Sequence, residues 1–218
     1  SWFHWTGITP AISQTAADVC LEAVRVADEL GITISTDFNY RAKLWQYGAA
    51  PEKVMSALIK FSDILLFSLE DAEKHFGIKP YVQPDTEEGL SEQAQAYQSV
   101  CEQMKKNYPK LKVMTSSVRR SISASHNDWG GMLYADHKMY ESHPYQITDI
   151  VDRVGGGDSY MAGLIYGLIR RPDDYQYVLD FAVAASCLKH TIKGDVNLVT
   201  VDEVEKLMEG DASGRVVR

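Results

Sequence analysis

Short apolar segments alternate with amphipathic segments along most of this chain, and this alternation limits its possible folds more than any other feature. The apolar segments, which we interpret as strands, are residues 3–8, 32–38, 64–67 and 112–116. The amphipathic segments, which we interpret as helices, are residues 16–30, 51–61, 70–76, 91–107, 158–169, 174–189 and 201–208. Strands that alternate with helices predict an α/β layered fold with a largely parallel sheet.

The first expected helix, residues 16–30, has apolar side chains at helical spacing. We expect it to bury one face, formed by Val19, Ala23, Val26, Ala27 and Leu30. Gly31 follows as a natural end of this helix, Gly77 does the same for the expected helix 70–76, and Pro51 opens the expected helix 51–61 at its first turn.

Two regions depart from the strand and helix alternation. Between residues 121 and 142 the pattern changes to strand-like alternation, with turn signals at Asn127-Asp128 and Gly130-Gly131. This pattern predicts antiparallel hairpins. Residues 79–88 are polar and contain prolines, so we interpret them as a surface loop within one domain that covers residues 1–218.

Composition and charge narrow the classes of protein. The chain has 218 residues with 45% hydrophobic and 24% charged residues, which is ordinary for a soluble globular protein. Its net charge of −8 argues against nucleic acid as the main partner, and no apolar run is long enough to predict a membrane span. Cys20, Cys101 and Cys187 are far apart and odd in number, which favours a reduced, cytoplasmic setting.

The run Gly155-Gly156-Gly157-Asp158 lies between a strand-like segment, Ile147–Val151, and an expected helix. Backbone N–H groups at a helix start bind anions, and an aspartate in the first turn stays ionised beside the same dipole. An anion cradle and a base on one helix start suit a phosphotransferase, although such a turn can equally be only a tight connection. Tyr160 excludes G-x-G-x-x-G, and the chain has no G-K-[ST] triplet to close a P-loop.

This glycine-aspartate run resembles the G-A-G-D signature of the ribokinase-like (PfkB) carbohydrate kinases, with Gly156 where alanine is usual. The resemblance implies a three-layer α/β/α fold, ATP as phosphate donor and Mg²⁺. It implies that Gly155, Gly156 and Gly157 form the anion hole, and that Asp158 is the catalytic base in contact with the substrate hydroxyl. Family members usually carry an N-terminal part before this point, so we expect the C-terminal portion of such a kinase, without the N-terminal strands and lid.

The polar run Asp37–Trp45 follows the second expected strand, where ligands bind in open α/β sheets. Without the family, a polar strand end with an Asx-type turn explains it as well. The run resembles the D-x-N-x-R-x-x-L-W segment of the 2-keto-3-deoxygluconate kinase branch. The resemblance implies that Arg41 binds a sugar-acid carboxylate and Asn39 lies near the nucleotide phosphates, and it leaves Asp37 as a residue that could orient Arg41.

Three further segments carry implied roles. Ser68, Glu70 and Asp71 stand where the family has N-x-x-E, which holds Mg²⁺ through water, but an N-cap with an acidic first turn explains them equally. Thr115 and Ser117 stand where the family shows T-x-G before the nucleotide.

The branch pattern K-H-T-x-x-G-D-x-N is intact over residues 189–197. It implies that Asp195 contacts a substrate hydroxyl and that Asn197 lies near the nucleotide base or an ion-binding loop. The alternative is a helix end at Gly194 followed by a solvated aspartate.

The resemblance as a whole implies a cytoplasmic enzyme that phosphorylates a sugar acid, 2-keto-3-deoxygluconate first among them, with ATP and Mg²⁺. A monovalent cation and a homo-oligomer are compatible with it. Two alternatives remain open: another PfkB kinase acting on fructose, ribose or a nucleoside, and a non-catalytic binding protein that kept the fold. The histidine spacings predict no zinc site.

Overall fold

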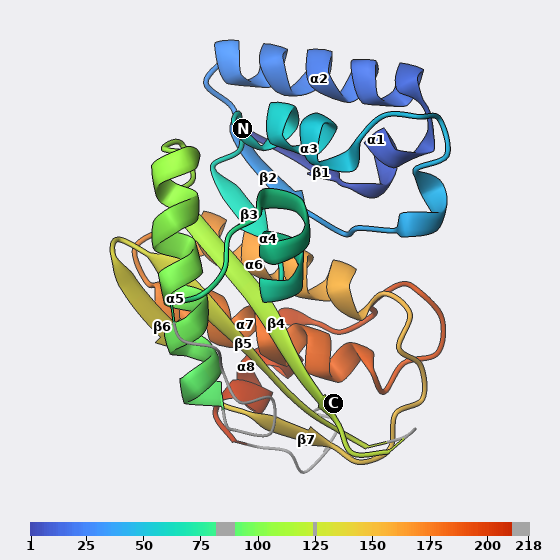
Figure 1. Ribbon diagram of the computed structural model, residues 1–218. Helices are drawn as coiled ribbons and strands as arrows, with labels where there is room; N and C mark the ends of the chain where they lie inside the picture. The colour runs from blue at the N-terminus through green and yellow to red at the C-terminus, as the bar shows by residue number, and fades with distance from the viewer. Residues whose placement is uncertain (82–89, 124–125, 211–218) are drawn as a thin grey trace. The chain divides into compact units, whose positions relative to one another are not determined.

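The computed structural model describes residues 1–81, 90–123 and 126–210, and the chain divides into two compact units (Figure 1). The first unit holds Ser1–Ser116 and Tyr134–Met139. The second holds Ser117–Leu133 and the described residues from Tyr140 onward. Among the described residues, no helix has the length and apolar character needed to cross a membrane.

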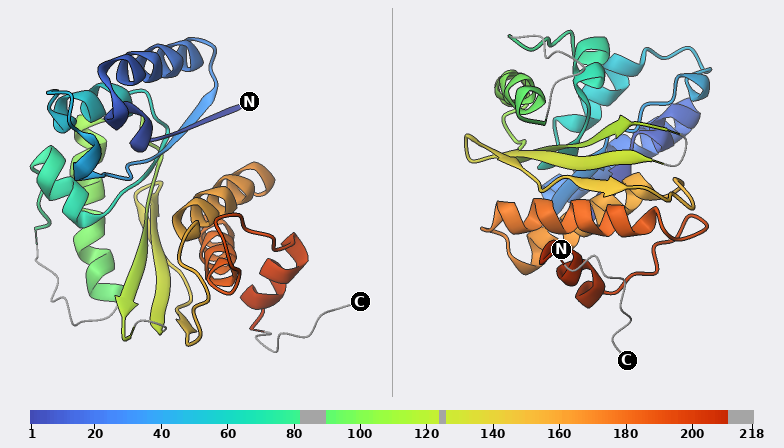
Figure 2. Two further views of the ribbon diagram at one scale, coloured as in Figure 1. Left: turned by 90° about the vertical axis from the view of Figure 1, so that its right-hand side faces the viewer. Right: turned by 90° about the horizontal axis from the view of Figure 1, so that it is seen from below.

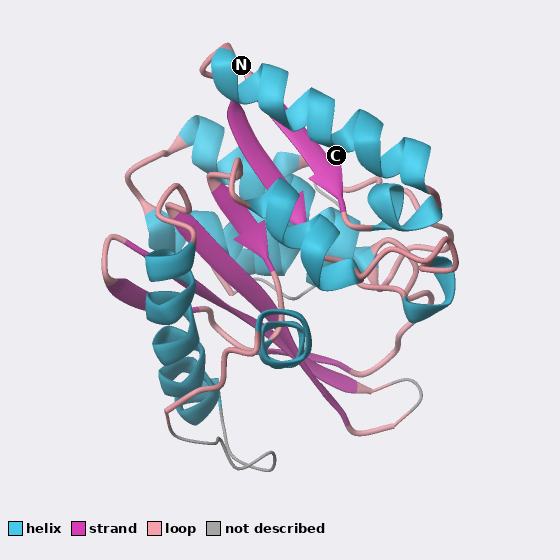
Figure 3. Cartoon of the chain, turned by 45° about the horizontal axis from the view of Figure 1, so that its top comes forward, coloured by secondary structure: helices cyan, strands magenta, loops and turns pink. Residues whose placement is uncertain are grey.

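The first unit is built on a parallel sheet (Figure 3). Its strands are β1 (Trp2–Thr6), β2 (Thr33–Asp37), β3 (Ile64–Leu66) and the first half of β4 (Val113–Ser121). The register pairs Thr6 with Asp37, Asp37 with Leu66, and Leu66 with Thr115. The carboxyl ends of β1, β2 and β3 therefore lie in one row beside Thr115 of β4, at the edge where α/β sheets bind ligands.

The helices of the first unit pack against this sheet and against one another. They are α1 (Ile8–Ile12), α2 (Gln14–Glu29), the 3₁₀ turn η1 (Ala42–Leu44), α3 (Pro51–Ile59), α4 (Leu69–Phe76) and α5 (Leu90–Asn107). Proline begins α3 and a left-handed Gly77 ends α4, as the sequence predicts. The predicted strand 3–8 ends early, because the chain turns at Gly7 into the short helix α1, which the sequence did not predict.

The predicted buried face of α2 is wrong. Val19, Val26 and Leu30 are 63%, 38% and 69% exposed, and only Ala27 of the expected apolar face is buried together with Ala17, Cys20 and Val24. These buried side chains are small and follow helical spacing, so α2 can lie close to its neighbours β2 and α1. The larger apolar side chains are left on the outer face.

The second unit combines strands with a tightly packed helix pair. It contains the end of β4, most of β5 (Asn127–Ala135), part of β6 (Lys138–Glu141), β7 (Tyr145–Ile147), α6 (Gly156–Arg170), α7 (Tyr175–Lys189) and α8 (Val201–Met208). Figure 2 shows α6 and α7 side by side. A Cβ on Gly163 would lie 2.9 Å from the Ala182 Cα, so the two helix backbones approach too closely for a larger residue.

The strands follow the order β1-β2-β3-β4-β5-β6, with β7 pairing antiparallel to β5. Together with the helices, this confirms the predicted α/β fold with a largely parallel sheet. The predicted surface loop at residues 79–88 falls mostly on residues 82–89, which lie outside the described residues.

The hairpin region was predicted correctly in type but not in its turns. Gly130 and Gly131 lie inside β5, and Asn127 and Asp128 begin it. A Cβ on Gly131 would lie 2.8 Å from Val183 and 2.9 Å from the Tyr160 hydroxyl, so this glycine marks a close approach of α6 and α7 to the strand. The second turn falls on Asp136 and His137, both with positive φ.

The strand-like interpretation of residues 147–151 is also wrong. β7 ends at Ile147, and the chain from there to the glycines has no strand structure. Val151 is 59% exposed, and its N–H donates to the His190 carbonyl at 2.8 Å instead of to a neighbouring strand. The apolar residues before the glycines therefore belong to a loop held by the end of α7.

Candidate active site

The glycine run forms the start of α6. Gly155 is the N-cap, with a left-handed φ of 78° and no side-chain cap, and Gly156, Gly157 and Asp158 form the first turn. Amide groups at a helix start have no acceptor within the helix, so they can bind an anion. A Cβ on Gly157 would meet nothing within 4 Å, which leaves open space beside these amides.

Asp158 is exposed in this first turn. Among the residues that the structure describes, no hydrogen bond or ion pair engages its carboxylate. The carboxylate is therefore free to take a proton from a bound hydroxyl group.

The structure brings two sequence motifs together at Gly155. A Cβ on this residue would lie 2.0 Å from the Asp195 carbonyl oxygen, closer than any real contact. Asp195, which the resemblance assigned to a substrate hydroxyl, thus lies against the first residue of the glycine turn and has an exposed side chain. Only glycine fits here, both for its positive φ and for the lack of space.

Asp152 and His190 hold the glycine turn in place, and the sequence analysis assigned neither a role. Asp152 accepts from Val154 N–H at 3.0 Å and from Gly194 N–H at 2.9 Å. These hydrogen bonds, first that of Val154 and then that of Gly194, lower the pKa of its carboxyl. The His190 carbonyl accepts from the N–H groups of Val151 and Asp152.

The side chain of Asn197 forms hydrogen bonds with the backbone of its own unit. Its side-chain amide donates to the Ala185 carbonyl at 3.1 Å, and its side-chain oxygen accepts from Val199 N–H at 3.2 Å. These bonds fix the chain between α7 and α8. They occupy the polar groups that the resemblance placed near the nucleotide base or an ion-binding loop.

In the first unit, the segment after β2 has the expected Asx-type turn. Asn39, with φ of 40°, donates its N–H to the Asp37 carboxylate at 3.1 Å. The Asn39 side chain donates to the Thr6 hydroxyl at 3.3 Å, which ties it to the neighbouring strand end. Both the turn and the position at the carboxyl edge of the sheet agree with the sequence.

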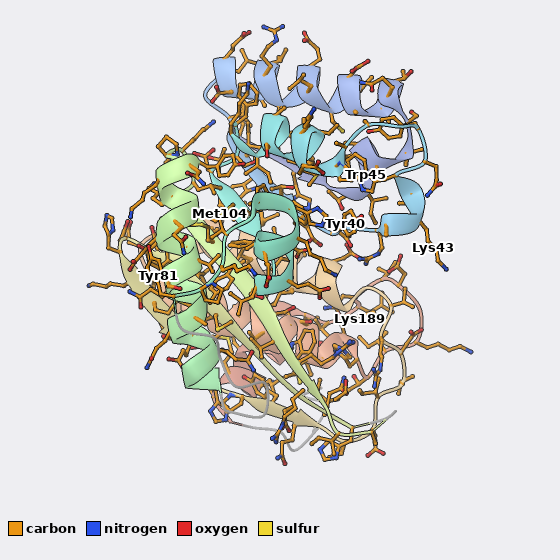
Figure 4. All side chains as sticks on the ribbon, in the orientation of Figure 1. Tyr40, Lys43, Trp45, Tyr81, Met104 and Lys189 are labelled. Carbon is orange, nitrogen blue, oxygen red and sulfur yellow. The ribbon has the colours of Figure 1, made fainter. Side chains whose placement is uncertain are left out.

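Arg41 lies exposed beyond this turn, between Tyr40 and Lys43, which Figure 4 labels. Its guanidinium donates to the Tyr40 carbonyl at 3.0 Å. The Asp37 carboxylate accepts from Asn39 N–H, and its role in orienting Arg41 stays a prediction. The Tyr40 ring packs on His75, with ring centroids 4.1 Å apart, and this contact ties the segment that carries Arg41 to α4.

Residues 68–71 form a complete capping box at the start of α4. The Ser68 hydroxyl accepts from Asp71 N–H, and the Asp71 carboxylate accepts from Ser68 N–H at 2.9 Å. Glu70 pairs with Lys74 on the surface. The cap interpretation is confirmed, and the described residues contain no group of three or more His, Cys, Asp or Glu that could hold a metal ion.

Ser68→Ala is expected to lower the free energy of unfolding by about 1 kcal/mol, because it removes an N-cap. Glu70→Gln is the matched control, since losing an exposed ion pair changes stability by about 0.5 kcal/mol or less. Urea unfolding of both variants measures the difference. Equal stability of Ser68→Ala and the wild type would contradict the capping role.

Thr115 and Ser117 lie on β4, on either side of the boundary between the units. Thr115 is fully buried and Ser117 is half-buried. The register places Thr115 in the row of strand ends with Leu66 and Asp37. Its position agrees with the predicted ligand edge, and its side chain is buried.

A parallel sheet with polar strand ends, and a helix that starts on an uncapped glycine turn with an exposed aspartate, define an α/β protein equipped to bind an anion. Comparison with known proteins gives the family. Residues 2–200 match the pfkB family carbohydrate kinases. The chain belongs to this family.

Several relatives resemble the chain over nearly all of its length. The 2-dehydro-3-deoxygalactonokinase of Haloferax volcanii is 28% identical over 97% of the chain and 58% of the relative. The crystal structure of 2-dehydro-3-deoxygluconokinase from Thermotoga maritima superposes with a TM-score of 0.83 and 38% identity, covering 96% of this chain and 60% of that one. A PfkB family carbohydrate kinase from Listeria grayi gives a TM-score of 0.79 and 33% identity, covering 94% and 59%. The chain thus spans less than two thirds of each relative.

Proposed function

We propose that this protein transfers the γ-phosphate of ATP to a hydroxyl group of a sugar acid, with 2-keto-3-deoxygluconate as the leading substrate. The start of α6 is the observation that carries the proposal. It combines uncapped amides, open space beside Gly157 and an exposed carboxylate on Asp158 within one helical turn. Phosphoryl transfer needs these two functions, which are charge stabilisation and proton acceptance.

In this proposal the residues of the second unit act on the reacting groups. Asp158 accepts the proton of the attacking hydroxyl. The amides of Gly157 and Asp158 stabilise the charge on the transferring phosphoryl group, aided by the helix dipole. The Gly156 N–H donates to the Arg153 carbonyl at 3.3 Å, so it would have to leave this acceptor to join them. Asp195, which lies against Gly155, contacts a substrate hydroxyl.

Arg41 is assigned to the carboxylate of the sugar acid. Its guanidinium is exposed, and its one hydrogen bond among the described residues goes to a backbone carbonyl, so its charge has no carboxylate partner in that part of the chain. A planar guanidinium binds a carboxylate through two parallel hydrogen bonds. Two kinases of keto-deoxy sugar acids among the relatives support this assignment.

Asn39, Ser68, Thr115, Ser117 and Asn197 remain assigned to the nucleotide side by resemblance alone. The family implies Mg²⁺ with ATP, and Mg²⁺ usually binds through one or two carboxylates, phosphates and water. Glu70 fits such a water-mediated role, because its exposed pairing with Lys74 exchanges readily, whereas the Asp71 carboxylate is engaged in the capping box. The ion would neutralise charge on the ATP phosphates.

The remaining assignments are a cytoplasmic location, a role for a monovalent cation and self-association into a homo-oligomer. The three free cysteines support the first of these, because reduced thiols are typical of the cytoplasm. The net charge of −8 supports small-molecule partners over nucleic acid.

Arg41→Ala is expected to raise KM for 2-keto-3-deoxygluconate roughly tens- to hundreds-fold, while KM for ATP changes little. Leaving a substrate carboxylate unpaired costs about as much as truncating a charge pair, roughly 2–4 kcal/mol. Lys43→Ala is the matched control, because it removes a neighbouring exposed cation from the same segment. Steady-state kinetics on the sugar acid and on fructose measure both effects.

The substrate panel also tests the proposal against its alternatives. A wild-type protein that prefers fructose, ribose or a nucleoside, with a preference that Arg41→Ala leaves unchanged, would replace the sugar acid by a neutral substrate. A folded protein that binds ATP but transfers no phosphate to any of these acceptors would favour the non-catalytic alternative.

A further inference from the structure

Gly156, the first residue of α6, lies directly against the ring of His190. A Cβ at position 156 would lie 3.1 Å from His190 Cε1 and 3.4 Å from Nε2. These distances are tighter than most real contacts, so either the ring or the helix start would have to move to admit an alanine. The ring thus occupies the space into which a larger residue at 156 would project.

The His190 ring has little freedom to withdraw. It is 2% exposed, its Nδ1 lies 2.7 Å from the Ser186 carbonyl oxygen, and it packs against Trp129 with ring centroids 4.8 Å apart. Ser186 also holds Gly156, because the Ser186 hydroxyl donates to the Gly156 carbonyl at 2.7 Å. One turn of α7 therefore fixes both the ring and the residue that the ring touches.

The surroundings of the His190 ring favour its neutral form. Burial lowers the pKa of His190, and the charges of Lys189, Arg153 and Arg119 lower it further, against the opposing effect of the Ser186 carbonyl. A ring with its proton on Nδ1 donates to the Ser186 carbonyl and turns its Cε1–Nε2 edge toward Gly156.

We propose that His190 is a positioning residue for the glycine turn, and that its ring sets the direction of the amides of Gly157 and Asp158. The proposal rests on the proposed function, because it matters only if these amides bind a transferring phosphate. It also explains why this chain has glycine at position 156. The ring takes the place of a side chain there, and the two residues form a size-matched pair.

A double-mutant cycle tests the pairing. Gly156→Ala is expected to lower kcat/KM for ATP by about tenfold to a hundredfold, since small displacements of reacting groups cost rates of this order. His190→Asn keeps a donor for the Ser186 carbonyl and removes the ring from Gly156. In the double variant the new methyl group has room, so we expect kcat/KM to recover at least half of the logarithmic loss. Gly156→Ala combined with His143→Asn, which changes an exposed histidine, should show no recovery.

A second readout does not depend on turnover. Titration with inorganic phosphate, followed by NMR of the Gly157 and Asp158 amides, should shift these signals in the wild type and in the double variant more than in Gly156→Ala. If the wild type shifts but transfers no phosphate, the proposed function fails while the positioning role stands. Positioning is overturned if Gly156→Ala matches the wild type in both readouts, or if the double variant is no better than Gly156→Ala.

Discussion

Asp158→Asn is expected to lower kcat by about 10²–10⁴-fold, which is the usual contribution of a general base. The amide keeps the size of the side chain and the start of α6 but cannot accept the proton of the attacking hydroxyl. ATP binding should remain within a few-fold of the wild type, because the backbone amides of the glycine turn are untouched. Steady-state kinetics and calorimetric ATP binding measure the two effects separately.

Asp173→Asn is the matched control for this experiment. Asp173 is exposed between α6 and α7 and has no assigned role. Like Asp158→Asn, Asp173→Asn removes one negative charge from the second unit, but kcat of this variant should equal that of the wild type. If Asp158→Asn keeps kcat within a few-fold of the wild type, Asp158 is not the catalytic base.

Gly155→Ala is expected to lower the free energy of unfolding by about 2–5 kcal/mol. A left-handed backbone costs an alanine about 1–2 kcal/mol, and forcing a side chain into a packed site adds about 1–3 kcal/mol. The second contribution arises because the new Cβ would meet the Asp195 carbonyl oxygen at 2.0 Å. The backbone has to move, so we also expect ATP-dependent turnover to be lost.

Gly77→Ala separates the two causes. Gly77 has a positive φ of 64°, but a Cβ there would meet nothing within 4 Å. Its cost should therefore be only the backbone contribution, about 1–2 kcal/mol. Guanidinium unfolding of both variants gives the comparison, and equal losses of stability would contradict the tight contact between Gly155 and Asp195.

The order of strands and helices and some helix ends could be predicted from local sequence patterns. The alternation of apolar and amphipathic segments gave the order of strands and helices, and Pro51 and Gly77 marked helix ends. The prediction of the buried face of α2 was wrong because the sequence of this helix has two apolar stripes. Burial follows the close approach that small side chains allow, so Ala17 and Cys20 are inside while Val19 is outside.

The candidate site could likewise be predicted only where its residues have a local sequence pattern. Gly155 and Asp158 could be located because a glycine turn at a helix start has a sequence signature. The turn is held by hydrogen bonds to backbone groups: the His190 carbonyl accepts from two N–H groups, and the Asp152 carboxylate accepts from Val154 and Gly194 N–H. Contacts with backbone groups leave no pattern in a sequence. The aspartates at 71 and 158 both occupy first turns of helices, and only the structure distinguishes the engaged carboxylate from the free one.

We propose phosphoryl transfer from ATP to a sugar acid at the start of α6. Its most direct test is to incubate the purified protein with 2-keto-3-deoxygluconate and ATP that carries a radiolabelled γ-phosphate, and to identify the product by chromatography and phosphorus NMR. We expect the label in a phosphate monoester of the sugar acid for the wild type, and a loss of about 10²-fold or more in its rate of formation for Asp158→Asn. Label that appears only in inorganic phosphate, or label transfer that is unaffected by Asp158→Asn, would contradict this account.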